Sequence, residues 1–166
     1  MFKHNHLFTI IVLVLIFLTS CGKNEEQIKK ELSARVFGYE SSLYKAYDPN
    51  NKKDELISEI KSFLKPGIIG ETRAENYYNE RQRFRNNWDS LKSNGFEFKI
   101  EISKIVFNEK KDEAKVNYLV VEKGINCRGI IGKDLKSIQT INSSVFVLIN
   151  GVWYRDVEKV VKSTCE

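Results

Sequence analysis

The hydrophobic pattern of the chain changes its period near residue 95. Before that point apolar residues recur every three or four positions, which predicts helices. The first such set predicts a helix over 28–47 through Ile28, Leu32, Val36, Tyr39, Leu43 and Tyr47. A shorter set predicts a second helix over 54–64, which ends at Pro66-Gly67. A third helix is predicted from Thr72, with Glu75 completing a capping box, up to a terminating Gly95.

After residue 95 the apolar positions alternate, which predicts strands. The stretch "FEFKIEI" (96–102) alternates strictly, and the phase then slips, which predicts a β-bulge near Ser103-Lys104. Further strands are predicted over 114–122, 137–149 and 152–158, with a long loop over 123–136 and a tight hairpin at Asn150-Gly151. The order of elements predicts an α+β fold, with N-terminal helices packed on a curved antiparallel sheet of about four strands.

The first 21 residues carry a targeting pattern. An uncharged apolar run extends from Leu7 to Leu18, which is too short to cross a bilayer. The run ends in Leu-Thr-Ser-Cys (18–21), which resembles the lipobox of bacterial lipoprotein signal peptides. That resemblance implies cleavage before Cys21, attachment of a lipid to its thiol and acylation, for example with palmitate, of the new N-terminus. The alternatives are an ordinary N-terminal helix and a signal peptide that is cut elsewhere.

The lipobox resemblance sets the expected domains and location. We expect a signal peptide over 1–20, the lipidated cysteine with a short polar tether over 21–27, and a single α+β domain over 28–166. The protein would then be lipid-anchored in the cell envelope. Gly22 resembles the residue that directs lipoproteins to the outer membrane, on its periplasmic face, if the source is Gram-negative.

Charge and residue content narrow the possible chemistry. Removing residues 1–20 removes one of 27 basic residues and no acidic one, so the mature charge is 26 − 22 = +4. These charges are interspersed, and export separates the protein from nucleic acid, so no nucleic-acid partner is expected. Both histidines lie in the removed segment, and neither a metal site nor a cofactor is predicted.

Cys127 and Cys165 are predicted to form a disulfide in an oxidising envelope, with two buried free thiols as the alternative.

The second half of the chain resembles a known superfamily. The stretch "VFVLINGVWYRDVE" (145–158) combines an apolar strand, an Asn-Gly turn and a strand with a tryptophan. Together with the bulged strand "FEFKIEISKIVF" and the preceding helices, it resembles the nuclear transport factor 2-like superfamily, with a cystatin-like fold as the near alternative. The resemblance implies a cone-like domain over roughly 30–160 with a ligand pocket between helices and sheet.

Candidate pocket residues follow from the predicted elements. Arg81 lies on the apolar face of the third helix, where a guanidinium binds a ligand anion, reaches water at the edge of the apolar face or pairs with a strand glutamate. The aromatic residues are either pocket walls or core. The predicted pocket set is Arg81, Tyr77, Trp88, Tyr118 and Tyr154.

Three functions remain open at this stage. The leading hypothesis is a non-enzymatic, membrane-anchored envelope lipoprotein that binds a small ligand, a peptide or a protein. The second is an immunity or exclusion lipoprotein whose surface caps a toxin or a phage component. The third is a small pocket enzyme in which Tyr118 or Tyr154 works with Asp89 or Asp156, because the mature chain has no histidine for a His–Asp pair.

Overall fold

The computed structural model describes residues 23–82, 85–93, 95–125 and 136–165. The chain divides into two compact units, Met1–Lys30 and Glu31–Glu166. The second unit holds the fold described below. Cys21 and Cys127, on which the lipid and disulfide predictions depend, lie outside the described residues. Within the described residues, no helix combines the length and the apolar character needed to cross a membrane.

Two of the predicted helices are present with small shifts at their ends. α2 spans Glu25–Lys45 and α3 spans Lys53–Phe63. The buried side chains of α2 include Leu32, Val36, Tyr39 and Leu43, all on the predicted apolar face. Periodicity of 3.6 residues therefore identified both helices and the face of α2 that enters the core.

The third helix begins earlier than predicted. α4 spans Ile68–Gln82, and its first helical hydrogen bond runs from the N–H of Glu71 to the carbonyl oxygen of Gly67, at 3.1 Å. The Thr72 hydroxyl donates to the carbonyl oxygen of Ile68 at 3.0 Å, so Thr72 lies inside the helix. The capping box predicted at Thr72 and Glu75 is therefore wrong, because the helix can start directly after the Pro66-Gly67 turn.

The single long helix predicted up to Gly95 is also wrong. α4 ends at Gln82, and a short 3-10 helix, η1 (Arg85–Asn87), and α5 (Trp88–Ser93) follow. Arg85 donates to the carbonyl oxygens of Pro49 at 2.7 Å and Asn51 at 2.8 Å, and these tertiary bonds compete with a continued helix. Gly95 does end α5 as predicted, with φ +68° and its N–H bonded to the carbonyl oxygen of Lys92 at 3.0 Å.

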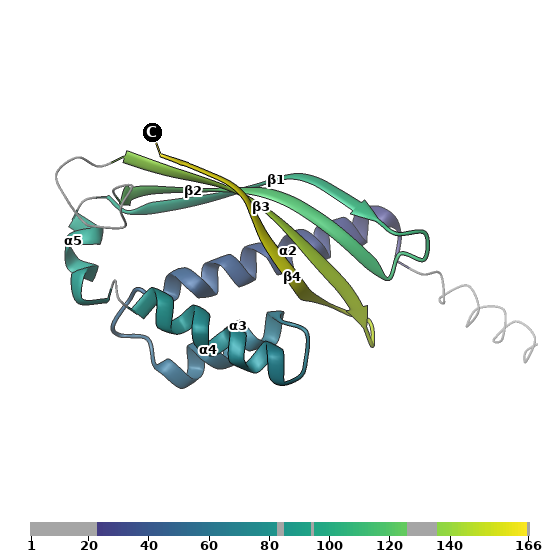
Figure 1. The fold of residues 1–166 in the computed structure, drawn as a ribbon, viewed down its shortest axis with the longest axis horizontal. Coiled ribbons are helices and arrows are strands. Elements are labelled where there is room, and N and C mark those ends of the chain that lie inside the picture. The colour runs from purple at the N-terminus through teal and green to yellow at the C-terminus, as the bar shows by residue number, and fades with distance from the viewer. Residues whose placement is uncertain (1–22, 83–84, 94, 126–135, 166) are drawn as a thin grey trace, which may run out of the picture. The chain divides into compact units, whose positions relative to one another are not determined.

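The four predicted strands form one antiparallel sheet in the order β1-β2-β3-β4 (Figure 1). They span Glu97–Phe107, Glu113–Ile125, Lys136–Ile149 and Val152–Cys165. The register shifts between Ile102 and Lys104, which confirms the predicted bulge. Asn150 and Gly151 have φ of 51° and 79°, as the tight hairpin between β3 and β4 requires. The C-terminal tail extends β4 to Cys165.

One face of the sheet packs on the helices. Alternate residues of β2 are buried, namely Ala114, Val116, Tyr118 and Val120. The helices form a second part of the core around Tyr39, Leu43, Ala46, Leu56, Ile60, Leu64, Ala74 and Tyr78. The end of α3 joins the β4 edge, where the N–H of Lys65 donates to the carbonyl oxygen of Arg155 at 2.8 Å. The fold is therefore α+β, with its helices N-terminal to an open four-stranded antiparallel sheet, as predicted.

Candidate functional site

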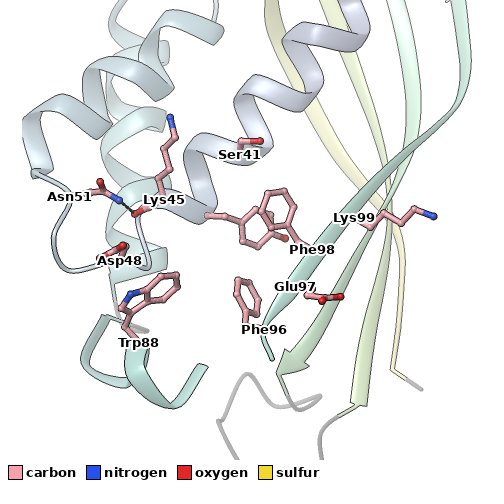
Figure 2. Close-up of a pocket in the computed structure, with 10 residues that line it drawn as sticks. Ser41, Lys45, Asp48, Asn51, Trp88, Phe96, Glu97, Phe98 and Lys99 are labelled. Carbon is pink, nitrogen blue, oxygen red and sulfur yellow. Dashed lines mark hydrogen bonds between the residues drawn. The ribbon is translucent and has the colours of Figure 1, made fainter. Parts of the chain in front are cut away.

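A pocket of about 680 Å³ lies between the C-terminal end of α2, the turn that follows it, α5 and the start of β1 (Figure 2). Its lining residues come from all four of these segments. They are Ser41, Tyr44, Lys45, Asp48, Asn51, Trp88, Phe96, Glu97, Phe98 and Lys99. The pocket thus depends on tertiary contacts between segments that are far apart in the sequence.

Aromatic side chains form the walls of this pocket. The rings of Tyr44 and Phe98 stack with centroids 3.9 Å apart and an interplanar angle of 15°. The ring of Phe96 lies 5.8 Å from that of Tyr44, and Trp88 lies across the pocket from Phe96 (Figure 2). Phe96, directly before β1, and Phe98 on β1 both contact Tyr44, which is buried on α2. Such a surface favours ligands with flat or apolar parts.

Most charged side chains that line the pocket form ion pairs or hydrogen bonds with residues outside the lining. The ammonium group of Lys45 lies 2.6 Å from a carboxylate oxygen of Glu59, and that of Lys99 lies 2.5 Å from Glu101. Figure 2 shows Lys99 directed away from the aromatic rings. The carboxylate of Asp48 accepts the backbone N–H of Asn50 at 2.9 Å. The interior of the pocket is therefore mainly apolar.

Arg85 holds the turn that closes one side of the pocket. Its guanidinium donates to the carbonyl oxygens of Asp48 at 3.2 Å, Pro49 at 2.7 Å and Asn51 at 2.8 Å. It also donates to the hydroxyl of Tyr78. Because three carbonyl oxygens share one planar cation, the turn is fixed before any ligand binds.

A second polar feature lies inside the core, around Arg155 of β4. Arg155 is only 2% exposed. Its guanidinium lies 3.2 Å from Glu40 of α2 and 3.3 Å from Glu158, and it packs 3.8 Å from the ring centroid of Tyr39. It also donates to the hydroxyl of Tyr118, which in turn donates to Glu40 at 2.7 Å. This arginine network, made of Arg155, Glu40, Glu158, Tyr118 and Tyr39, joins α2 to the sheet.

The pKa shifts in the arginine network follow from burial. Burial raises the pKa of the Glu40 carboxyl, and Arg155 opposes that shift only in part. Burial likewise raises the pKa of Tyr118 far above its usual range. For Arg155, burial lowers the pKa, but Glu158, Tyr118 and Glu40 together raise it beyond the ordinary value, so the guanidinium stays charged. The network therefore holds a permanent cation inside the core.

Of the five residues predicted to share one pocket, Tyr77 and Tyr118 lie together at the arginine network, whereas Trp88 and Tyr154 lie elsewhere. Tyr77 and Tyr118 both reach Glu158, with oxygen–oxygen distances of 3.3 and 3.2 Å. Trp88 lines the aromatic pocket. The guanidinium carbon of Arg81 lies 5.9 Å from the ring centroid of Tyr47. The guanidinium carbon of Arg35 lies 5.4 Å from the ring centroid of Tyr154.

Sequence reasoning missed most of the pocket wall. The sequence pattern places Phe96 and Phe98 on one face of a strand, but Tyr44 lies outside the apolar periodicity that predicts the first helix. The alternation of Phe96 and Phe98 was a usable signal, because it puts two aromatic rings on the same face of the chain. Arg155 was also missed, although it shares the buried face of β4 with Trp153.

The acid–base pairs considered for catalysis are not formed. The side chain of Asp89 is 100% exposed and lies 3.7 Å from Lys92. Asp156 lies 3.2 Å from Lys65. In the part of the chain that the structure describes, neither aspartate hydrogen-bonds to Tyr118 or Tyr154, and Tyr118 contacts glutamates instead.

The remaining predicted sites are covered only in part. Cys165 is disulfide-bonded, but Cys127 lies outside the described residues, so the Cys127–Cys165 pairing stays a prediction. No group of three metal-ligating side chains occurs among the described residues.

No family model matches the chain, and no curated protein matches it either.

Proposed function

We propose that the protein is a membrane-anchored lipoprotein of the cell envelope whose domain binds a small, mainly apolar ligand. The observation that carries this proposal is the pocket of about 680 Å³ with Tyr44, Phe96, Phe98 and Trp88 in its walls. Ligand pockets in proteins measure about 300–1,000 Å³ and combine apolar walls with a few polar groups. Here the polar groups are Ser41, Asp48 and Asn51, of which Asp48 already accepts hydrogen bonds from Asn50 and Asn51 donates to the carbonyl oxygen of Lys45.

Binding fits this pocket better than catalysis does. A general base has to reach the proton that it removes from a substrate. Tyr118 and Glu40, the closest acid–base pair, are 0% and 4% exposed and lie in the core rather than among the residues that line the pocket. The lining carboxylate of Asp48 already accepts hydrogen bonds from Asn50. We therefore propose a non-enzymatic role.

Membrane anchoring is proposed from the sequence. The apolar run of 7–18 and Cys21 provide the signal and the lipid attachment point. The order of helices before an antiparallel sheet supports the proposed likeness to the nuclear transport factor 2-like superfamily. We propose the outer membrane as the anchoring site if the source is Gram-negative, with the domain in the periplasm.

Replacing Phe98 by alanine is expected to weaken binding of the aromatic probe 1-naphthol at least tenfold. The substitution removes the ring that stacks on Tyr44 and opens the pocket wall, and a tenfold loss corresponds to about 1.4 kcal/mol. The dissociation constant is measured by titrating the fluorescence of the probe with the purified mature protein.

The matched control for this titration is Phe107→Ala. Phe107 lies on the same strand and is also half-buried, but its ring packs against Trp153, 6.3 Å away, outside the pocket. The control should bind the probe within about twofold of the wild type. Equal weakening by both substitutions, or no binding of the probe to the wild type, would contradict the proposed role of the pocket.

A further inference from the structure

Two adjacent isoleucines project from the start of α4. Ile68 is 83% exposed and Ile69 is 69% exposed, whereas the next most exposed large hydrophobic residue described, Val161, reaches 58%. Single exposed apolar side chains are ordinary on protein surfaces. Two neighbours of this size that are both mostly in water form an apolar tip, which is typical of a surface that contacts another apolar phase.

The backbone around this apolar tip is fixed by its neighbours. Leu64 forms a parallel bridge with Arg155 at the edge of the sheet. An added Cβ on Gly70 would lie 2.3 Å from the carbonyl oxygen of Lys65, so the start of α4 is pressed against the turn before it. The inner side of the first helical turn is therefore occupied, and Ile68 and Ile69 are held outward.

A surface pocket of about 460 Å³ adjoins the two isoleucines. Apolar residues and glycines of the turn form most of its lining, and polar side chains complete it. The lining consists of Leu64, Lys65, Pro66, Gly67, Ile68, Ile69, Gly70, Arg73, Arg155 and Asp156. An apolar surface beside cationic groups matches the boundary between acyl chains and headgroups of a bilayer.

The charges around the tip have a positive excess. Two lysines form ion pairs, Lys61 with Glu71 at 2.5 Å and Lys65 with Asp156 at 3.2 Å. Arg73, which lines the same pocket, donates to the backbone carbonyl oxygen of Asp156 instead. A carbonyl oxygen does not neutralise a guanidinium, so these three cations against two carboxylates leave an excess of one positive charge. Anionic lipids attract such groups.

We infer that Ile68 and Ile69 insert into the headgroup boundary of an anionic bilayer, with the neighbouring cations Lys65 and Arg73 attracted to the lipid phosphates. The inference rests on the proposed lipid anchor at Cys21, which would hold the domain at the bilayer surface. A second contact of this kind fixes the orientation of a tethered domain, because the tether removes most of the cost of bringing the surfaces together. The lipid anchor and the apolar tip then act as two membrane signals.

The test places a tryptophan at the tip of the full lipid-modified protein. Ile68→Trp and the control Val152→Trp are each reconstituted in vesicles of phosphatidylethanolamine and phosphatidylglycerol, with and without brominated acyl chains. Val152 is also an exposed apolar residue, at 41%, but belongs to β4. The emission of Trp88 and Trp153 is subtracted by using the wild-type protein in the same vesicles.

The expected result is blue-shifted emission from the tip tryptophan and its quenching by brominated lipid, with at least twofold weaker quenching in pure phosphatidylcholine vesicles. The control tryptophan should stay unshifted and unquenched. If the tip tryptophan emits as in water while the protein remains with the vesicles, the inference is wrong and the lipid anchor stands. If the protein does not float with the vesicles at all, the proposed anchor is wrong. Equal quenching in both lipid mixtures would overturn the role given to Lys65 and Arg73.

Discussion

Replacing Arg155 by methionine is expected to lower the free energy of unfolding by about 3–5 kcal/mol, which is the usual cost of removing one partner from a buried ion pair. The substitution leaves Glu40 without its cation at 4% exposure and leaves the hydroxyl of Tyr118 without its donor. The loss is measured by chemical denaturation at neutral pH, followed by circular dichroism.

Two further variants separate a charge effect from a packing effect. The double variant Arg155→Met/Glu40→Leu should recover part of the loss, because apolar residues of similar size often replace a buried ion pair without penalty. Arg73→Met is the matched control, since Arg73 is only partly buried and donates to a carbonyl oxygen. A cost for Arg155→Met that is no greater than that of Arg73→Met would show that the arginine network does not hold α2 to the sheet.

Replacing Cys21 by serine is expected to abolish membrane anchoring. Each methylene of an acyl chain contributes about 0.8 kcal/mol of membrane affinity, so losing two or three chains removes stable attachment. Metabolic labelling with palmitate should fall to background, and the protein should leave the membrane fraction. Both are measured on fractionated cells that express the full chain.

Cys165→Ser is the control for the lipid experiment. Cys165 is disulfide-bonded, so this variant tests the general effect of losing a cysteine without touching the proposed lipid site. It should keep palmitate labelling at the wild-type level. Labelling that survives Cys21→Ser would refute the lipobox interpretation, and labelling lost in both variants would leave Cys21 without a specific role.

Local sequence patterns were enough to predict much of the sheet. The alternation of 96–102, its phase slip at Ser103-Lys104 and the Asn150-Gly151 turn each depend on backbone geometry that neighbouring residues control. These patterns predicted the first strand, its bulge and the last hairpin, and the structure contains all three. The tail "KVVKSTCE" has no strict alternation and allows either a helical turn or an extension of the last strand, and pairing with β3 makes it an extension of β4 up to Cys165.

The end of α4 and the pairing of Arg155 depend on tertiary contacts, which a sequence pattern does not reveal. The apolar positions of 72–94 fit one helix, but Arg85 bonds to a turn more than thirty residues earlier, at 48–51, and α4 ends before it. Arg155 shares the alternation of its strand and gains its partner Glu40 from a helix 115 residues away in the sequence. Neither contact leaves a local signal.

The candidate pocket illustrates the same limit. Trp88 was predicted as a pocket residue, but Phe98 and Tyr44 become a wall only because α2 crosses β1 at that point. The meeting of Tyr77 and Tyr118 at Glu158, away from Trp88, likewise depends on contacts between α4 and the sheet. Spacing along one element identifies a face, whereas a pocket requires the relative position of several elements.

The proposed binding function is tested most directly by the two indole N–H signals of the mature protein in ¹H–¹⁵N NMR spectra. The chain has two tryptophans. Trp88 lines the pocket, and its indole nitrogen is buried without a hydrogen-bond partner in the described part of the chain, whereas Trp153 is 3% exposed beside Phe107. On titration with 1-naphthol, the Trp88 signal should shift to saturation while the Trp153 signal stays in place. A saturating titration in which Trp88 does not move, or moves no more than Trp153, would contradict the account.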